Sequence, residues 1–178
     1  MNIPFREFLA LDSEGFVKAA YRFILGREAD AGGFDSHVSR LLVGVDRVAL
    51  LYDLSRSSEA RQGLGPYSDL SNLDDDAFVE ALYLRLLKRR ADPLGKLHYL
   101  EVIRKSEGRR SAIREMEASE EFAGRNPQLL AFHRQFQQIM EMERRRRSWW
   151  RGWRGDQRRE HKLNQLLEAV LSMKQRKP

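Results

Sequence analysis

The chain has 178 residues, of which 42% are hydrophobic, and a formal net charge of +6. This length allows one ordinary domain, or two small helical units that share a core. The sequence contains no cysteine, which excludes disulfides, thiolate nucleophiles and cysteine-based metal sites. No stretch approaches the roughly 18 apolar residues that span a bilayer, and the N-terminus lacks the pattern of a cleaved signal. We therefore expect a cytoplasmic protein.

The excess of positive over negative charge lies entirely in the C-terminal part of the chain. Residues 1–142 hold 20 Lys and Arg against 22 Asp and Glu, whereas residues 143–178 hold 12 against 4. A basic segment attracts phosphate groups, either of nucleic acid or of anionic lipids. The search for a charged partner therefore concerns this segment, because the rest of the chain is nearly neutral.

The sequence repeats itself at an offset of 62 positions. Residues 11–60 align with residues 73–122 without a gap, and 14 of the 50 aligned positions are identical. The identical pairs include Leu11/Leu73, Asp12/Asp74, Phe16/Phe78, Val17/Val79, Tyr21/Tyr83, Arg27/Arg89, Asp30/Asp92, Gly33/Gly95, Arg47/Arg109, Ser57/Ser119 and Glu59/Glu121. This pattern indicates an internal duplication, and two copies of a helical unit normally bury their apolar faces against each other.

Each copy is predicted to contain three helices. The first helix begins after an N-cap aspartate, Asp12 or Asp74, and an apolar stripe at helical spacing follows. Its end is marked by Gly26 in the first copy. Asp30 and Asp92 are predicted to cap the second helices, which Gly44 and Gly108 terminate before the third helices. The apolar stripes of the first helices are Phe16, Ala19, Ala20, Phe23 and Ile24, and Phe78, Ala81, Leu82 and Leu86.

The predicted fold class is therefore all-α, with tandem duplicated three-helix units packed as one helical domain and a basic helical tail. We place the first repeat at residues 1–63 and the second at residues 73–125, joined by a linker. Residues 126–142 form a packing helix whose apolar stripe covers the end of the repeat core. Residues 143–178 form the basic tail. The stripe of the packing helix is Leu129, Phe132, Phe136, Ile139 and Met140.

The recurring residues carry a family resemblance. The string Phe-Val-x-x-x-Tyr-x-x-Ile/Leu-Leu-x-Arg-x-x-Asp-x-x-Gly, closed by Ser57-x-Glu59 and Ser119-x-Glu121, resembles the bacterial domain of unknown function 4214. That family is distantly similar to phycobilisome linker domains. The resemblance implies a helical, non-catalytic module of surface-layer and secreted proteins and of enzymes of cell-surface polysaccharide synthesis, where it holds or positions partners.

The sequence departs from the family pattern at three places. The middle helices carry His37 and Tyr99 where the family usually has tryptophan or a similar aromatic. Lys88 stands where the first copy has Gly26, and Lys96 stands where it has Phe34. These changes suggest that the second unit is specialised or packed differently.

Six polar residues recur in the two copies: Arg27, Asp30, Glu59, Arg89, Asp92 and Glu121. One interpretation makes the acids calcium ligands, but calcium requires six to eight oxygen ligands and the dense acidic loop of such sites is missing. The favoured interpretation is structural, with the aspartate capping a helix while the arginine bridges to the glutamate. We predict no catalytic residue, no metal ligand and no cofactor, because nucleophile, phosphate-loop and metal-binding motifs are absent.

The basic tail combines arginines with tryptophans, in the set Arg144, Arg145, Arg146, Arg147, Trp149, Trp150, Arg151, Trp153 and Arg154. Indole rings at the headgroup level and guanidinium groups on phosphates are typical of an anionic membrane surface. Two alternatives stay open: binding of single-stranded nucleic acid, and a solvated charge run whose tryptophans pack on a neighbour. A later apolar stripe, Leu163–Leu171, forms a short amphipathic helix that pairs in an oligomer, docks on the body or begins a longer coiled coil.

We therefore expect a non-enzymatic scaffold or adaptor at the cytoplasmic face of the inner membrane. Its partner would be a glycosyltransferase or another component of cell-surface polysaccharide or surface-layer assembly, as the resemblance implies. His37 and Tyr99, taken as exposed residues of the middle helices, are the candidate contacts. The rival functions are a nucleic-acid-binding adaptor that uses the tail and a carbohydrate-binding module.

Overall fold

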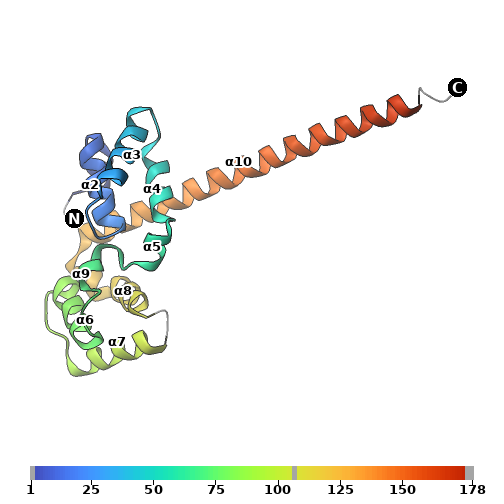
Figure 1. Cartoon of the computed structure of the whole chain (residues 1–178). Coiled ribbons are helices and arrows are strands. Elements are labelled where there is room, and N and C mark those ends of the chain that lie inside the picture. Colours follow the sequence, from blue (N-terminus) through green and yellow to red (C-terminus); the bar gives the residue numbers. More distant parts are fainter. Residues whose placement is uncertain (1–2, 106–107, 175–178) are drawn as a thin grey trace. The chain divides into compact units, whose positions relative to one another are not determined.

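The computed structural model describes the backbone of residues 3–105 and 108–174, and the side chains of residues 3–105 and 108–150. All regular secondary structure in these ranges is helical, as the sequence predicts (Figure 1). The chain divides into two units, Met1–Ile139 and Met140–Pro178. The first unit contains both repeats and the start of the last helix.

The first repeat contains three main helices and two short ones. The short helix at its end, in which Glu59 lies, is a separate element that the sequence interpretation merges with the third predicted helix. It is separate because the Ser57 hydroxyl accepts a hydrogen bond from the Ala60 N–H and starts a new helix. The helices are α1 (Phe5–Ala10), α2 (Ser13–Ile24), α3 (Ala31–Leu42), α4 (Arg47–Ser55) and α5 (Ser58–Gln62).

The second repeat follows the same order, with α9 as the counterpart of α5. The linker between the copies folds as a 3-10 helix and buries Tyr67, which the sequence interpretation does not foresee. The elements are η1 (Gly65–Leu70), α6 (Asp75–Leu82), the π-helical turn η2 (Tyr83–Leu87), α7 (Pro93–Lys105), α8 (Arg109–Ala118) and α9 (Glu120–Arg125).

Aspartate caps start α2 and α3 in the first copy and α6 and α7 in the second. The carboxylates of Asp12 and Asp74 accept hydrogen bonds from the backbone N–H three residues later, at 3.0 and 2.8 Å. Asp30 and Asp92 cap the next helices in the same way, each at 2.8 Å. These bonds satisfy N–H groups that have no partner within the helix. The four predicted caps are confirmed.

Each repeat builds its core around the Phe-Val pair of its first helix. Phe16 and Val17 in one copy, and Phe78 and Val79 in the other, are fully buried. Arginines at equivalent positions cover the two phenylalanine rings: the Arg47 guanidinium lies 5.1 Å from the Phe16 centroid, and that of Arg109 lies 4.8 Å from Phe78. Burying each phenylalanine contributes about 1.5–3 kcal/mol to folding.

The start of α10 (Pro127–Lys174) joins the two cores. Leu129 and Leu130 pack against the buried cluster of the second repeat. Further along the helix, the Phe132 ring lies 5.1 Å from Phe5 and 4.8 Å from Phe23 in the first repeat. The first turns of α10 therefore face both copies. The sequence interpretation separates a packing helix from a later helix in the tail, whereas the backbone of α10 is helical throughout.

Positions 26 and 88 end the first helices with the same backbone turn. Gly26 has φ of 68° and Lys88 has φ of 54°, both in the left-handed region. Only Gly26 is sterically obligatory, because a Cβ there would lie 1.9 Å from the Gly65 carbonyl oxygen and 2.7 Å from the Ser68 hydroxyl. The linker thus packs directly on the end of α2.

We expect Gly26→Ala to lower the free energy of unfolding by roughly 3 kcal/mol or more. The variant would place a Cβ on a left-handed backbone and would also create a steric clash. Gly44→Ala is the matched control, since Gly44 also has positive φ, of 92°, but a Cβ at that position would meet no atom within 4 Å. It should cost about 1 kcal/mol. Urea denaturation measures both changes, and equal losses would contradict the close packing of the linker.

Candidate functional site

The six recurring polar residues form two equivalent clusters. In the first repeat the Arg27 guanidinium binds the Glu59 carboxylate through two hydrogen bonds, of 2.5 and 2.9 Å. It also lies 3.5 Å from the Asp30 carboxylate and 5.4 Å from the centroid of the Tyr21 ring. The arginine therefore ties the end of α2 to the start of α3 and to α5.

The second repeat reproduces this arrangement at the positions 62 residues later. Arg89 binds Glu121 through bonds of 2.7 and 2.8 Å, and its Nη1 donates to Asp92 at 3.1 Å. Its guanidinium lies 5.0 Å from the Tyr83 ring centroid. The structure thus brings together the predicted residues of each copy and keeps the two clusters separate.

A recurring glycine beside each cluster makes room for the tyrosine. A Cβ at Gly33 would lie 2.5 Å from the Tyr21 hydroxyl oxygen, and one at Gly95 would lie 2.1 Å from that of Tyr83. The tyrosine hydroxyl therefore approaches the first turn of the second helix closely in both copies. This contact explains why the spacing between tyrosine and glycine recurs in the sequence.

The chemistry of the clusters is that of structural ion pairs. Hydrogen bonds from Arg27 lower the pKa of Glu59, and those from Arg89 lower the pKa of Glu121. The pKa of Asp30 is lowered chiefly by the hydrogen bond from the Gly33 backbone. The acids are thus engaged by arginine and backbone donors. Among the described side chains, no group of three or more His, Asp and Glu residues is arranged to hold a metal ion.

The middle-helix residues face the tyrosines of these clusters. The His37 ring is half-buried, with its centroid 5.6 Å from that of Tyr21, and the Tyr99 ring lies 5.7 Å from Tyr83. Tyr99 is only 8% exposed, and burial raises its pKa to about 12. The expectation that both residues are exposed is therefore wrong for Tyr99, which is buried, whereas His37 is half-buried. Their role as partner contacts stays a prediction.

The arginine run lies on α10 within the second unit. Arg144 and Arg145 both bind the Glu141 carboxylate, and hydrogen bonds from these two arginines lower the pKa of Glu141 to about 2. Arg146 and Arg147 bind Glu143 in the same way, with Nε–O distances of 2.6 Å. The four arginines therefore share two carboxylates, which leaves a net charge of +2 in this stretch.

Two tryptophans follow the arginine run with their rings accessible to solvent. Trp149 is 62% exposed and Trp150 is 45% exposed, and their rings meet edge to face at 5.1 Å. Arg145 precedes Trp149 by four residues and Arg146 precedes Trp150 by four, so each indole shares a helix face with a guanidinium. We call residues 144–150 the Arg/Trp segment.

The remaining residues of the predicted tail site are Arg151, Trp153 and Arg154. Their side chains lie outside the described residues, as do those of Leu163–Leu171, although the backbone there belongs to α10. Of the helices in the described part of the chain, none is long and apolar enough to cross a membrane.

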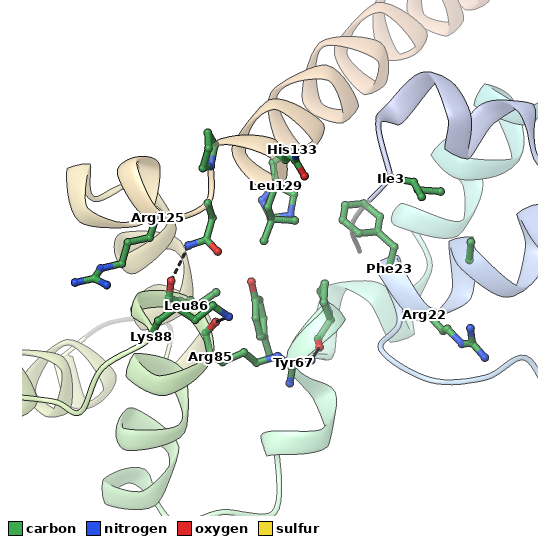
Figure 2. A pocket seen from close by; sticks show the side chains of 15 residues that line it. Ile3, Arg22, Phe23, Tyr67, Arg85, Leu86, Lys88, Arg125, Leu129 and His133 are labelled. Carbon is green, nitrogen blue, oxygen red and sulfur yellow. Dashed lines mark hydrogen bonds between the residues drawn. The ribbon is translucent and has the colours of Figure 1, made fainter.

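A pocket of about 630 Å³ opens where the two repeats and the start of α10 meet. Figure 2 shows Phe23, Tyr67, Leu86 and Leu129 around its central space. We call it the inter-repeat pocket. The Tyr67 hydroxyl donates to the Glu117 carboxylate at 2.5 Å, and His133 lies 3.8 Å from the same carboxylate. Burial raises the pKa of Tyr67 and lowers the pKa of His133.

The sequence interpretation missed this pocket. Tyr67 lies in the segment taken for a linker, and Asn126, taken for a helix cap, donates from its side-chain amide to the Leu86 carbonyl at 2.6 Å. Two features of the sequence could have indicated the pocket. One is Lys88, which replaces the glycine of the first copy and lines the pocket. The other is Tyr67, an aromatic residue inside a turn-forming segment.

The fold and the duplicated clusters define a tandem helical-repeat protein. The family model described as domain of unknown function (DUF4214) matches the chain twice, over residues 5–63 and 67–126. The chain therefore belongs to the DUF4214 family, in agreement with the resemblance noted in the sequence. No curated protein and no solved structure matches the chain. The likeness to phycobilisome linker domains stays an expectation.

We expect Glu59→Gln to lower the free energy of unfolding at pH 7 by at most about 1 kcal/mol, because the ion pair with Arg27 is half-exposed. The folded pKa of Glu59 is depressed, so its stabilisation is present above the unfolded pKa and is lost as pH falls through the folded pKa. Denaturation of variant and wild type between pH 7 and 2.5 should therefore converge at low pH. Glu14→Gln, which breaks the more exposed pair with Lys18, is the control and should lower the free energy of unfolding at pH 7 by less than Glu59→Gln.

Proposed function

We propose that the protein is a non-enzymatic adaptor whose Arg/Trp segment binds an anionic membrane surface. The observation that carries the proposal is the exposure of Trp149 and Trp150 beside four arginines on one helix. Exposed indoles are costly in water and favourable at the headgroup level of a bilayer, while guanidinium groups bind lipid phosphates. The basic excess of residues 143–178 supports the same assignment.

The helical body supplies the partner-binding part of the proposal. Two copies of one cluster hold their short helices by arginine–glutamate pairs, and we infer a structural role for both clusters. A protein with this construction positions a partner rather than transforming a substrate. Membrane attachment raises the local concentration of that partner without changing its chemistry. The resemblance noted in the sequence suggests a glycosyltransferase or another component of cell-surface polysaccharide or surface-layer assembly, at the cytoplasmic face of the inner membrane.

Co-sedimentation with vesicles tests the membrane part. The full chain should bind vesicles of 70% phosphatidylcholine and 30% phosphatidylglycerol, and bind pure phosphatidylcholine at least tenfold more weakly. Trp149→Ala with Trp150→Ala should reduce binding to the anionic vesicles by roughly tenfold, because both interfacial anchors are lost. Raising the salt concentration should weaken binding through screening of the arginines.

Leu94→Ala with Leu97→Ala is the matched control. It removes two other exposed apolar side chains, which lie on α7 in the first unit, and should leave vesicle binding unchanged. Equal binding by the tryptophan variant and the wild type would overturn the proposal. Retention of single-stranded oligonucleotide, abolished by the tryptophan substitutions and without any vesicle binding, would favour a nucleic-acid adaptor instead.

A pull-down from the native host tests the partner part. Both the full chain and the Trp149→Ala, Trp150→Ala variant should retain the same protein partner, because these substitutions lie outside the repeats. Only the wild-type chain should carry that partner into the membrane fraction. Loss of the partner together with the membrane would indicate that the tail, and not the helical body, binds it.

A further inference from the structure

The inter-repeat pocket has the size and lining of a small-molecule site. Its volume of about 630 Å³ lies within the range that such sites usually occupy. Aromatic and aliphatic side chains surround the centre, with Phe23 from the first repeat, Leu86 from the second and Leu129 from α10 (Figure 2). This part of the pocket offers an apolar surface to a ligand.

The charges at the margin have one sign. Four cationic side chains, Arg22, Arg85, Lys88 and Arg125, line the pocket, and none of its described lining residues is Asp or Glu. Figure 2 shows Arg22 and Arg125 at opposite sides of the pocket, and the Arg85 guanidinium lies 5.3 Å from the Tyr67 ring centroid. An apolar centre with a cationic margin fits an anion that carries an apolar body.

The three arginines are held in place by carboxylates outside the lining. Arg85 donates to both oxygens of Asp69 and to the Pro66 carbonyl. Arg22 donates to Glu28 at 2.5 Å, and Arg125 donates to Glu121 at 3.2 Å. These pairs compensate much of the arginine charge. Of the four cations, Lys88 is therefore the one best placed to pair with a ligand anion.

Lys88 differs from the arginines in its partner. Its Nζ donates to the Arg85 backbone carbonyl at 2.7 Å, and within the described part of the chain it makes no ion pair. An ammonium group has three donors, so two remain for a ligand. Lys88 and Tyr67 both line the pocket (Figure 2).

The backbone at Lys88 provides a second, independent observation. Its φ of 54° is the only positive value at a non-glycine residue in the described chain, and the equivalent position in the first repeat is glycine. The π-helical turn η2 directly precedes it. Left-handed non-glycine residues and π-helical turns both occur preferentially at functional sites, where a side chain is needed despite its conformational cost.

We propose that the inter-repeat pocket binds an amphipathic small-molecule anion, an acyl or aryl compound with a carboxylate or phosphate head group, and that Lys88 binds the head group. The apolar body lies between Phe23, Leu86 and Leu129, and the head group lies at the margin next to Lys88. This site uses neither of the tryptophans of the Arg/Trp segment, so it is independent of the proposed membrane contact.

Isothermal titration of the full chain carrying Trp149→Ala and Trp150→Ala tests the proposal, because this background removes the anchoring indoles of the basic helix. The probes are decyl phosphate and decanoate below their micellar concentrations. Inorganic phosphate and decyltrimethylammonium serve as probes that lack the apolar body or the negative charge. We expect saturable binding of at least one decyl anion, and binding at least tenfold weaker for both comparison probes. A preference between the two anions identifies the head group.

Lys88→Gly is the decisive variant, because glycine is the residue best suited to a left-handed position and the fold should be retained. It should weaken binding of the decyl anion by about tenfold, whereas Arg90→Ala, which removes an equal charge two residues away and outside the lining, should change it less than twofold. Nitrogen-15 spectra should show the Tyr67 and Asn126 amides shifting on binding. Absence of saturable binding, equal binding by Lys88→Gly, or equal binding of the decyl cation would overturn the proposal.

Discussion

The structure of the first unit depends on the burial of the first turns of α10 against two cores at once. Leu129 and Leu130 complete the core of the second repeat, and Phe132 fills the space between α1 and α2 of the first. Neither repeat is large, and small helical units gain stability when neighbouring copies share an apolar interface. Because one helix serves both cores, it also places both repeats around the inter-repeat pocket.

Within each repeat the same polar cluster performs the same task. The arginine after the first helix reaches the glutamate of the last short helix and lies against the tyrosine ring, while the aspartate caps the second helix. Half-exposed ion pairs contribute little free energy individually. Their value here is geometric, because bidentate binding fixes the direction in which α5 and α9 leave the helices before them.

The two copies have diverged where they meet other parts of the chain. At the end of α2, Gly26 allows the linker to approach its backbone, whereas the equivalent turn after η2 carries Lys88 on an open pocket. Duplication supplied two equivalent turns. The turn at Gly26 packs against the linker. The turn at Lys88 carries the side chain that we propose to bind the ligand. The Arg/Trp segment on α10 adds a different kind of surface, with charge and exposed indoles on a helix outside the repeats.

The sequence by itself determined the all-α class, the duplication, the four aspartate caps and the residues of each polar cluster. These features follow from local spacing, since helix caps and apolar stripes involve neighbours a few positions apart. The tertiary structure decided what depends on contacts between distant segments. Tyr99 is buried because the Tyr83 ring lies against it, although the family pattern gave no direction for its side chain. Tyr67 and Lys88 line one pocket because η1, η2 and α10 converge there, and no spacing rule links residues that the chain brings together only through packing of the two cores.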